Sequence, residues 1–343
     1  MQVQRLAAYV AASILLISLL NLAHPLLAIL IGILVAALLA EAIIVNVKQS
    51  FLRFDDGPGT APLSSGAFST EHLTIRNMHA VLVKSRHTPA ERAPVVILHH
   101  GYGSTYRRML VYAYPLALNG YAVLLYNTIG HGKVVKARGK VLDERTPGDK
   151  TGIVEIMRAL ERVVEHVKGR PDLDGTRIGF VGISLGAIVG LTHGACNPDI
   201  KCVIALAGVH DFKKTSTRRL VPLTSDWWMK KSFEWSGLEM NPTKLQDFII
   251  SPAFYAGKQF GFFDHPVWSD ARIADKIFLI HCMDDCTIPF SNFEENVKAF
   301  GLPASHYLAL EKGNHWFIRQ EHVVIGQVLH WLGTTLPLDQ IKH

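Results

Sequence analysis

Cysteine is scarce in this sequence, with four residues among 343. So few thiols in so long a chain exclude a disulfide scaffold, and a reducing compartment suits them. His281, Cys282 and Cys286 stand close together, but the sequence offers no second pair of ligands at the spacing of a zinc site. We therefore expect neither a metal nor another cofactor.

The sequence also has little excess of positive over negative charge, since the formal net charge is +6. No basic run is interleaved with aromatic residues, as a groove for nucleic acid requires. The small basic cluster at residues 213–219 is more typical of a solvated surface. We expect no nucleic-acid partner, and the sequence leaves the oligomeric state open.

Apolar residues are densest at the N-terminus, where they make up 36 of the first 47 residues. Two runs, 6–23 and 26–45, contain 18 and 20 residues. As helices they would rise about 27 and 30 Å, close to the thickness of the hydrocarbon core of a bilayer. Pro25 lies between them and cannot continue a helical hydrogen-bond ladder. The pattern predicts a transmembrane helical hairpin that anchors residues 1–48 in membrane lipid.

Basic residues flank this segment at both outer ends: Arg5 before it, Lys48 and Arg53 after it. Such residues favour the cytoplasmic side, so we expect the following domain to be cytoplasmic. A secretory signal peptide would have an apolar core less than half as long. A single long kinked span, which would place the domain outside, remains an alternative.

A spacer rich in glycine and proline is expected over residues 49–68, and one large domain over residues 69–343. In this domain short apolar segments alternate with longer amphipathic ones. That alternation predicts an α/β fold with a mainly parallel sheet and helices on both faces, preceded by an antiparallel strand pair around Asn77. The expected strands are 72–76, 80–84, 94–99, 121–126, 177–182, 202–207, 276–281 and 306–310, and the expected helices are 107–118, 150–168, 185–194, 293–300 and 316–331.

The alternation lapses between residues 209 and 270. This stretch holds four of the six tryptophans and many phenylalanines. We interpret it as an aromatic-rich cap insertion over a binding site, although the same aromatics would also suit an ordinary hydrophobic core.

A G-x-S-x-G pattern occupies residues 182–186, where an expected strand ends and a helix begins. This is the context of a nucleophile elbow, in which small residues at 182 and 186 let strand and helix pack closely while Ser184 sits on a strained turn. A serine hydroxyl is a poor nucleophile at neutral pH, so it needs a neighbouring base that is itself oriented by a carboxylate.

Those partners are expected after later strands, in the order serine, acid, histidine. Asp284 and Asp285 follow strand 276–281, and both are candidates for the acid. His315 follows strand 306–310 in a glycine-containing loop and is the candidate base. For the oxyanion we expect two backbone N–H donors, Leu185 after the nucleophile and Tyr102 in the glycine-containing loop after strand 94–99.

With these segments together, the sequence resembles the α/β-hydrolases, most closely the dienelactone hydrolase and prolyl-oligopeptidase-like branch. The resemblance covers roughly residues 69–332. It implies an eight-stranded type of sheet, and its H-G-x-x-D-x-x-[VI]-P motif selects Asp285 over Asp284. Cys282 departs from the usual glycine of that motif. The matching segments are residues 100–103, 127–132, 177–186, 281–289 and 313–316.

The expected function is therefore that of a membrane-anchored serine hydrolase. Ser184, His315 and Asp285 would cleave an ester or thioester of an apolar acyl or aryl substrate through an acyl-enzyme. A serine peptidase acting on short peptides is one alternative. A catalytically silent, membrane-tethered binding module is another, but such modules usually lose a member of the triad, and here all three residues are present.

Overall fold

The computed structural model describes residues 66–87, 92–137, 140–146, 153–210, 273–285 and 287–338, with residues 18, 25–27, 29–37 and 40 near the N-terminus. The chain divides into two compact units, Met1–Phe54 and Asp55–His343. The predicted cap falls almost wholly outside the described residues, which resume at Ile273 after His210.

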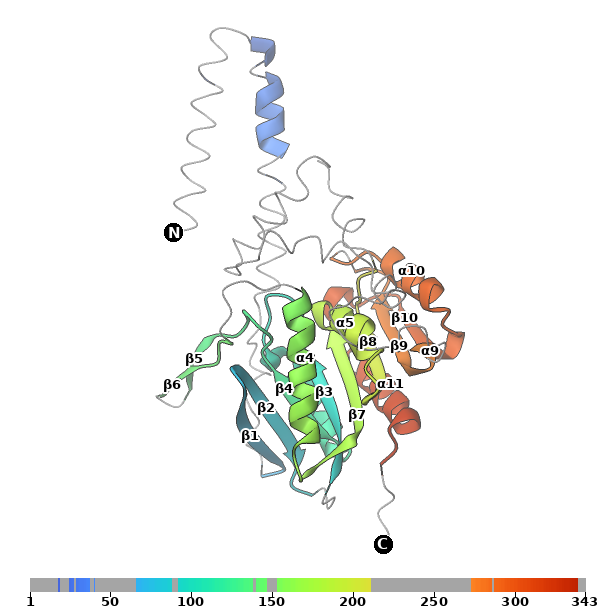
Figure 1. Ribbon diagram of the computed structural model, residues 1–343. Helices are drawn as coiled ribbons and strands as arrows, with labels where there is room; N and C mark the ends of the chain where they lie inside the picture. The colour runs from blue at the N-terminus through green and yellow to red at the C-terminus, as the bar shows by residue number, and fades with distance from the viewer. Residues whose placement is uncertain are drawn as a thin grey trace. The chain divides into compact units, whose positions relative to one another are not determined.

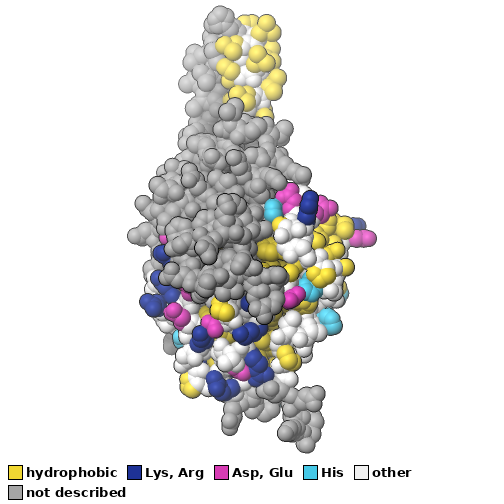
Figure 2. All heavy atoms as spheres, turned by 45° about the vertical axis from the view of Figure 1, so that its right-hand side comes forward, with side chains coloured by type: hydrophobic (Ala, Val, Ile, Leu, Met, Phe, Trp, Pro, Cys, Tyr) yellow, Lys and Arg dark blue, Asp and Glu magenta, His cyan; other side chains and the backbone are white. Residues whose placement is uncertain are grey.

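In the first unit, the described residues include helical stretches at 25–27 and 29–37. Their apolar side chains are exposed, as Figure 2 shows for this segment, and Leu30 and Ile33 are each more than half exposed. Within the described residues, none of the helices combines the length and hydrophobicity needed to cross a bilayer. The transmembrane hairpin expected over residues 1–48 stays a prediction. Most of residues 1–48, and most of the predicted spacer, lie outside the described ranges.

The second unit is built on an eight-stranded sheet in the order β1-β2-β4-β3-β7-β8-β9-β10 (Figure 1). Strands β4 to β10 in this order run parallel, while β1 pairs antiparallel with β2 and β2 with β4. The predicted mostly parallel eight-stranded sheet is confirmed. The strands are β1 Phe68–Ile75, β2 Met78–Ser85, β3 Ala93–His99, β4 Ala122–Tyr126, β7 Leu173–Ile183, β8 Ile200–Leu206, β9 Ile277–Cys282 and β10 Tyr307–Leu310.

Both faces of the sheet are covered, which explains why its central strands are almost continuously apolar. Along β3, Val95 and Ile97 pack into one hydrophobic cluster while Val96 and Leu98 pack into the other. The first cluster includes side chains of α4 (Ile153–Lys168) and α5 (Leu185–Val189), and Figure 1 shows α4 lying across that face. The second cluster includes α3 (Leu110–Leu118) and α11 (Glu321–Thr335).

Several elements differ from the sequence prediction, including the last helix, the helix expected over 185–194 and a hairpin. The last helix starts at Glu321 rather than near residue 316, because Asn314–Trp316 first form a separate 3-10 turn, η6. The helix expected over 185–194 is α-helical to Val189 and then a π-helix, Gly190–Gly194. A two-stranded hairpin, β5 (Val134–Ala137) and β6 (Lys140–Asp143), was not predicted and forms its own small sheet beside the main one (Figure 1).

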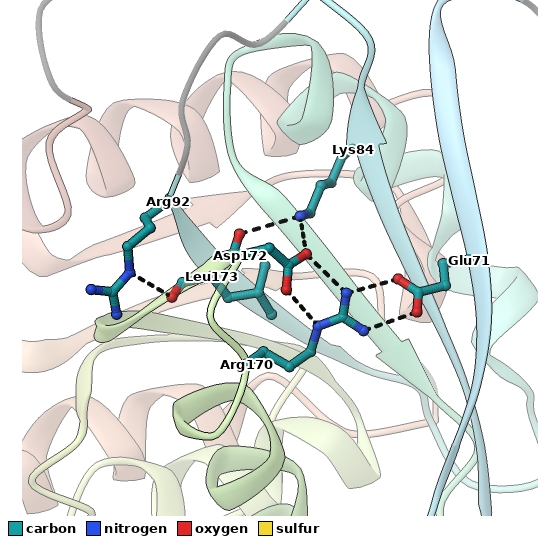
Figure 3. A network of polar contacts seen from close by, with 6 residues as sticks. All are labelled: Glu71, Lys84, Arg92, Arg170, Asp172 and Leu173. Atoms are coloured by element: carbon teal, nitrogen blue, oxygen red, sulfur yellow. Dashed lines mark hydrogen bonds and ion pairs between the residues drawn. The ribbon is translucent and has the colours of Figure 1, made fainter.

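A polar network fastens the antiparallel edge of the sheet to the loop that precedes β7 (Figure 3). Arg170 makes paired hydrogen bonds to Glu71 of β1 and to Asp172, and Lys84 of β2 also contacts Asp172. These groups are partly exposed, so each pair contributes only about 0–1 kcal/mol. The loops that carry the predicted site residues follow the carboxyl ends of the parallel strands. The polar network lies at the opposite ends of these strands.

Candidate active site

Ser184 stands on a strained turn between β7 and α5. Its backbone has φ 55° and ψ −110°, a conformation that a residue with a side chain rarely adopts. The Ser184 N–H donates to Leu206 O of β8 at 2.9 Å, and the Ser184 carbonyl accepts from Ile188 N at 3.1 Å. These two bonds hold the turn between the sheet and the helix that follows.

The two glycines of the motif allow three pieces of backbone to come together. A Cβ placed on Gly182 would lie 2.3 Å from the carbonyl carbon of Gly186. A Cβ on Gly186 would lie 2.3 Å from the carbonyl oxygen of His99 at the end of β3. Neither position can accept a side chain without moving backbone, so the close strand–helix packing predicted at these residues is confirmed.

The loop after β3 lies directly against the elbow. A Cβ on Gly101 would be 3.3 Å from Ser184 Cβ and 3.3 Å from Trp316 Cη2, so this glycine marks the point where three loops converge. Tyr102 follows it in a turn closed by the bond from Ser104 N to Gly101 O. Leu185 is buried and is the first residue of α5, so its N–H has no acceptor within the helix.

Buried histidines support this loop from behind. His100 Nδ1 donates to Gly101 O at 2.7 Å, and His100 Nε2 accepts from Thr128 N at 3.2 Å, which fixes a neutral ring as the link between two loops. His99 and His131 likewise donate Nδ1–H to backbone carbonyls. Burial lowers the pKa of His99 to about 4 and that of His131 to about 4, and it lowers the pKa of His100 well below its usual value.

The predicted base and one of the predicted acids are in direct contact. His315, in the turn η6 after β10, donates Nδ1–H to Asp285 Oδ2 at 2.8 Å. The other oxygen, Asp285 Oδ1, accepts from the N–H groups of Thr287 and Ile288 at 2.8 and 2.9 Å. Burial alone would raise the pKa of Asp285, but hydrogen bonds from His281 and His315 outweigh it and hold the pKa well below the usual range.

The neighbouring carboxylate, Asp284, binds the backbone of the loop before His315. It accepts from Gly313 N at 3.2 Å and from Asn314 N at 2.7 Å. These bonds fasten the backbone that leads into His315. Asp285 therefore orients the imidazole, while Asp284 holds the loop that carries it.

One residue of this cluster was not predicted from the sequence as part of the site. His281, whose sequence position suggested only a metal ligand, is buried near the end of β9. Its Nε2 lies 2.9 Å from Ile288 O and 3.4 Å from Asp285 Oδ2. A polar residue at the end of an otherwise apolar strand, four positions before a candidate acid, is the signal that could have indicated it. Within the described residues, which omit Cys286, no cluster of three or more His, Cys, Asp or Glu side chains is arranged to hold a metal.

The buried neutral histidines predict a dependence of stability on pH. An unfolded histidine titrates near pH 6.5, while His99 and His131 in the folded protein titrate near pH 4. Between these values the unfolded chain binds more protons, so stability falls as the pH is lowered, by at most about 3 kcal/mol for each residue. Urea unfolding at several pH values from 7.5 to 4.5 measures this.

A matched variant assigns the effect. His131→Asn keeps a donor near the position of Nδ1 and does not titrate, so its unfolding midpoint should fall less steeply with pH than that of the parent protein. The carboxylate of Asp285 has a lowered pKa, so the stability it contributes is present at neutral pH and is lost mainly below about pH 4, under the range measured. Equal slopes for the two proteins would contradict the assignment.

Comparison with known proteins gives matches of two kinds. The model of the Hydrolase_4 family, described as "Serine aminopeptidase, S33", matches residues 90–253. A protein of Bacillus subtilis (strain 168) named "Putative esterase YitV" is 27% identical over 184 residues, covering 49% of this chain and 69% of that protein.

Solved structures show the same fold at low identity. Acylaminoacyl peptidase of Pyrococcus horikoshii matches with a TM-score of 0.55 and 18% identity, covering 84% of this chain but only 45% of its own. Est1E of Butyrivibrio proteoclasticus, with ferulic acid bound, matches with a TM-score of 0.51 and 15% identity. The match covers 78% of this chain and all of Est1E. 2,6-Dihydroxy-pseudo-oxynicotine hydrolase matches with a TM-score of 0.53 and 17% identity. That match covers 80% of this chain and 70% of the hydrolase.

This chain thus spans less than half the length of the acylaminoacyl peptidase. The sheet order, the strained serine between β7 and α5 and the family match all point to one assignment. The chain has the α/β-hydrolase fold and is similar to serine hydrolases over residues 90–253.

Proposed function

We propose that Ser184, His315 and Asp285 form a catalytic triad that hydrolyses an ester or thioester through an acyl-enzyme. The observation that carries the proposal is the 2.8 Å contact between His315 Nδ1 and Asp285 Oδ2, on loops that converge with the elbow of Ser184. A binding module without catalytic activity would have no need of this buried, charged contact.

The tautomer of His315 follows from its partner and defines its role. Because Nδ1–H is donated to a carboxylate, the neutral ring carries its lone pair on Nε2. Nε2 accepts the proton of Ser184 Oγ as the hydroxyl attacks the acyl carbonyl, and it then returns the proton to the leaving group. Asp285 keeps the ring in this orientation and stabilises the imidazolium, since its lowered pKa keeps it charged.

Attack on the carbonyl creates an oxyanion that needs preorganised donors. We assign the backbone N–H groups of Tyr102 and Leu185 to this role, because the loop of the first and the helix start of the second both adjoin Ser184. Each such donor stabilises the transition state by a few kcal/mol. Water then attacks the acyl-enzyme by the same route, with His315 as base, and releases the acid.

An ester or thioester of an apolar acyl or aryl group is the substrate class we favour. The aromatic-rich stretch at 209–270 supports it, and so does the similarity to a protein named as an esterase. Cleavage of short peptides is the second candidate, favoured by the match to a family model described as a serine aminopeptidase.

Membrane attachment through residues 1–48 completes the proposal, with membrane lipid as the partner and the catalytic unit in the cytoplasm. The two apolar runs of the sequence support it. The exposed apolar side chains at residues 29–37 support it as well.

Labelling with a fluorophosphonate tests the nucleophile. The detergent-solubilised protein should react with the probe and hydrolyse p-nitrophenyl esters faster than aminoacyl-naphthylamides, while Ser184→Ala should do neither. Ser291→Ala is the matched control, because Ser291 begins α10 (Ser291–Phe300) and takes no part in the proposed chemistry. An unlabelled parent protein would contradict the proposal, and faster cleavage of the amides would select the peptidase.

Substitution of Asp285 and of Asp284 tests whether the first orients His315 and the second holds the loop. Asp285→Asn should lower kcat roughly 10⁴-fold, because an amide cannot stabilise the imidazolium or hold the same tautomer. Asp284→Asn keeps an oxygen that can accept from Asn314 N, so its kcat should fall less than about tenfold. Steady-state kinetics on one ester measures both. Equal losses would show that the acid is wrongly assigned.

Fractionation tests the anchor. The full chain should remain with membranes after washes in high salt and alkaline carbonate, because a spanning helix is not released by removal of charge. In sealed vesicles with the cytoplasmic face outward, added protease should digest the catalytic unit. Release by the washes would refute membrane anchoring, and protection from protease would favour the single kinked span.

A further inference from the structure

His281 is the buried group nearest the proposed triad that the mechanism above does not use. It lies on β9 with its side chain 1% exposed, four residues before Asp285. Its Nε2 is 3.4 Å from Asp285 Oδ2, the same oxygen that accepts the hydrogen bond from His315. Two imidazoles therefore meet at one carboxylate oxygen.

The direction of the hydrogen bond follows from the second partner of Nε2. The carbonyl oxygen of Ile288 lies 2.9 Å away and can only accept, so Nε2 of His281 carries the hydrogen. The Nε2–H of His281 is therefore donated to Ile288 O, and it also lies close to Asp285 Oδ2. His281 is thus a donor toward Asp285 and cannot take the proton of Ser184.

These bonds form a closed ring around the carboxylate. Ile288 donates its N–H to Asp285 Oδ1 at 2.9 Å and accepts from His281, while His281 reaches Oδ2 of the same aspartate. Rotation of the carboxylate would break contacts on both oxygens at once. The ring therefore fixes which oxygen faces His315.

The surroundings of His281 hold its ring in this place. Phe290 and Phe293 pack at 6.0 Å between ring centroids, the first edge to face. Ala205, Gly208 and Asn296 line the same small hollow behind the ring. Mostly apolar packing of this kind leaves the imidazole little freedom to turn away from the loop.

We propose that His281 is a positioning residue, which holds the carboxylate of Asp285 in the orientation that presents Oδ2 to His315. This inference rests on the proposed function, since it concerns the same triad. It predicts that loss of the Nε2–H donor slows the chemical step and leaves substrate binding nearly unchanged, because Nε2 contacts Asp285 and Ile288.

Two substitutions separate the donor from the bulk of the ring. His281→Phe keeps the ring and removes the donor, so kcat per active site should fall roughly 10- to 100-fold while KM changes by less than about threefold. His281→Gln carries an amide N–H that can reach the position of Nε2, and its kcat should return to within about threefold of the parent value. Active sites are counted by titration with the fluorophosphonate before ester kinetics are measured.

His306→Phe is the matched control. His306 also bonds a backbone carbonyl, Ala274 O at 3.0 Å, and packs edge to face on Trp331, but its bonds lie outside the triad. It should lower the thermal midpoint without lowering kcat per active site. Should His281→Phe not fold, His281→Leu, which is smaller and also lacks the donor, takes its place with the same expected result.

The outcomes are distinct for the two proposals. If the parent protein does not react with the probe, the proposed function fails. If the parent reacts but the donor-less variant of His281 keeps its kcat, or falls no further than His306→Phe, the positioning role is refuted. A loss in His281→Gln as large as in His281→Phe also overturns it, since the donor would then not be what matters.

Discussion

Close approach of three backbone segments at Ser184 is the constraint on which the site depends. The end of β7, the start of α5 and the end of β3 come so near that a single Cβ on Gly182 or Gly186 would overlap backbone atoms. The strained φ of Ser184 exists because this packing leaves the turn no other path. Strain of about 1–3 kcal/mol is tolerable here because β3 and the last six residues of β7 are buried in a large sheet.

Everything else in the site is arranged around that point by parallel strands that end at one edge. The ends of β3, β7, β9 and β10 lead into the loops that carry Tyr102, Ser184, Asp285 and His315 respectively. Each loop is then fixed by its own hydrogen bonds. His100 joins the first loop to the turn after β4, and Asp284 fastens the last. The proposed chemistry thus depends on short-range contacts at the edge of the sheet.

The sheet itself followed from sequence. Its eight strands were predicted close to their observed bounds, because strands buried on both faces must be almost continuously apolar. The hairpin β5–β6 was missed because it lies beside the main sheet, and Val134 and Val141 in it are at least half exposed. The start of α11 was placed too early, because Phe317 and Arg319 adopt positive φ angles that interrupt the helix and that the apolar pattern does not reveal.

By itself the sequence determined the fold and the candidate residues, because the length and spacing of apolar runs and the glycines around Ser184 are local properties. The selection of Asp285 over Asp284 rested only on the resemblance to an α/β-hydrolase motif. Tertiary structure decided which of them faces His315, because two neighbouring carboxylates are chemically alike and differ only in the path of the loop that carries them. It also disclosed His281, whose contacts with Asp285 and Ile288 depend on the folding of the loop after β9.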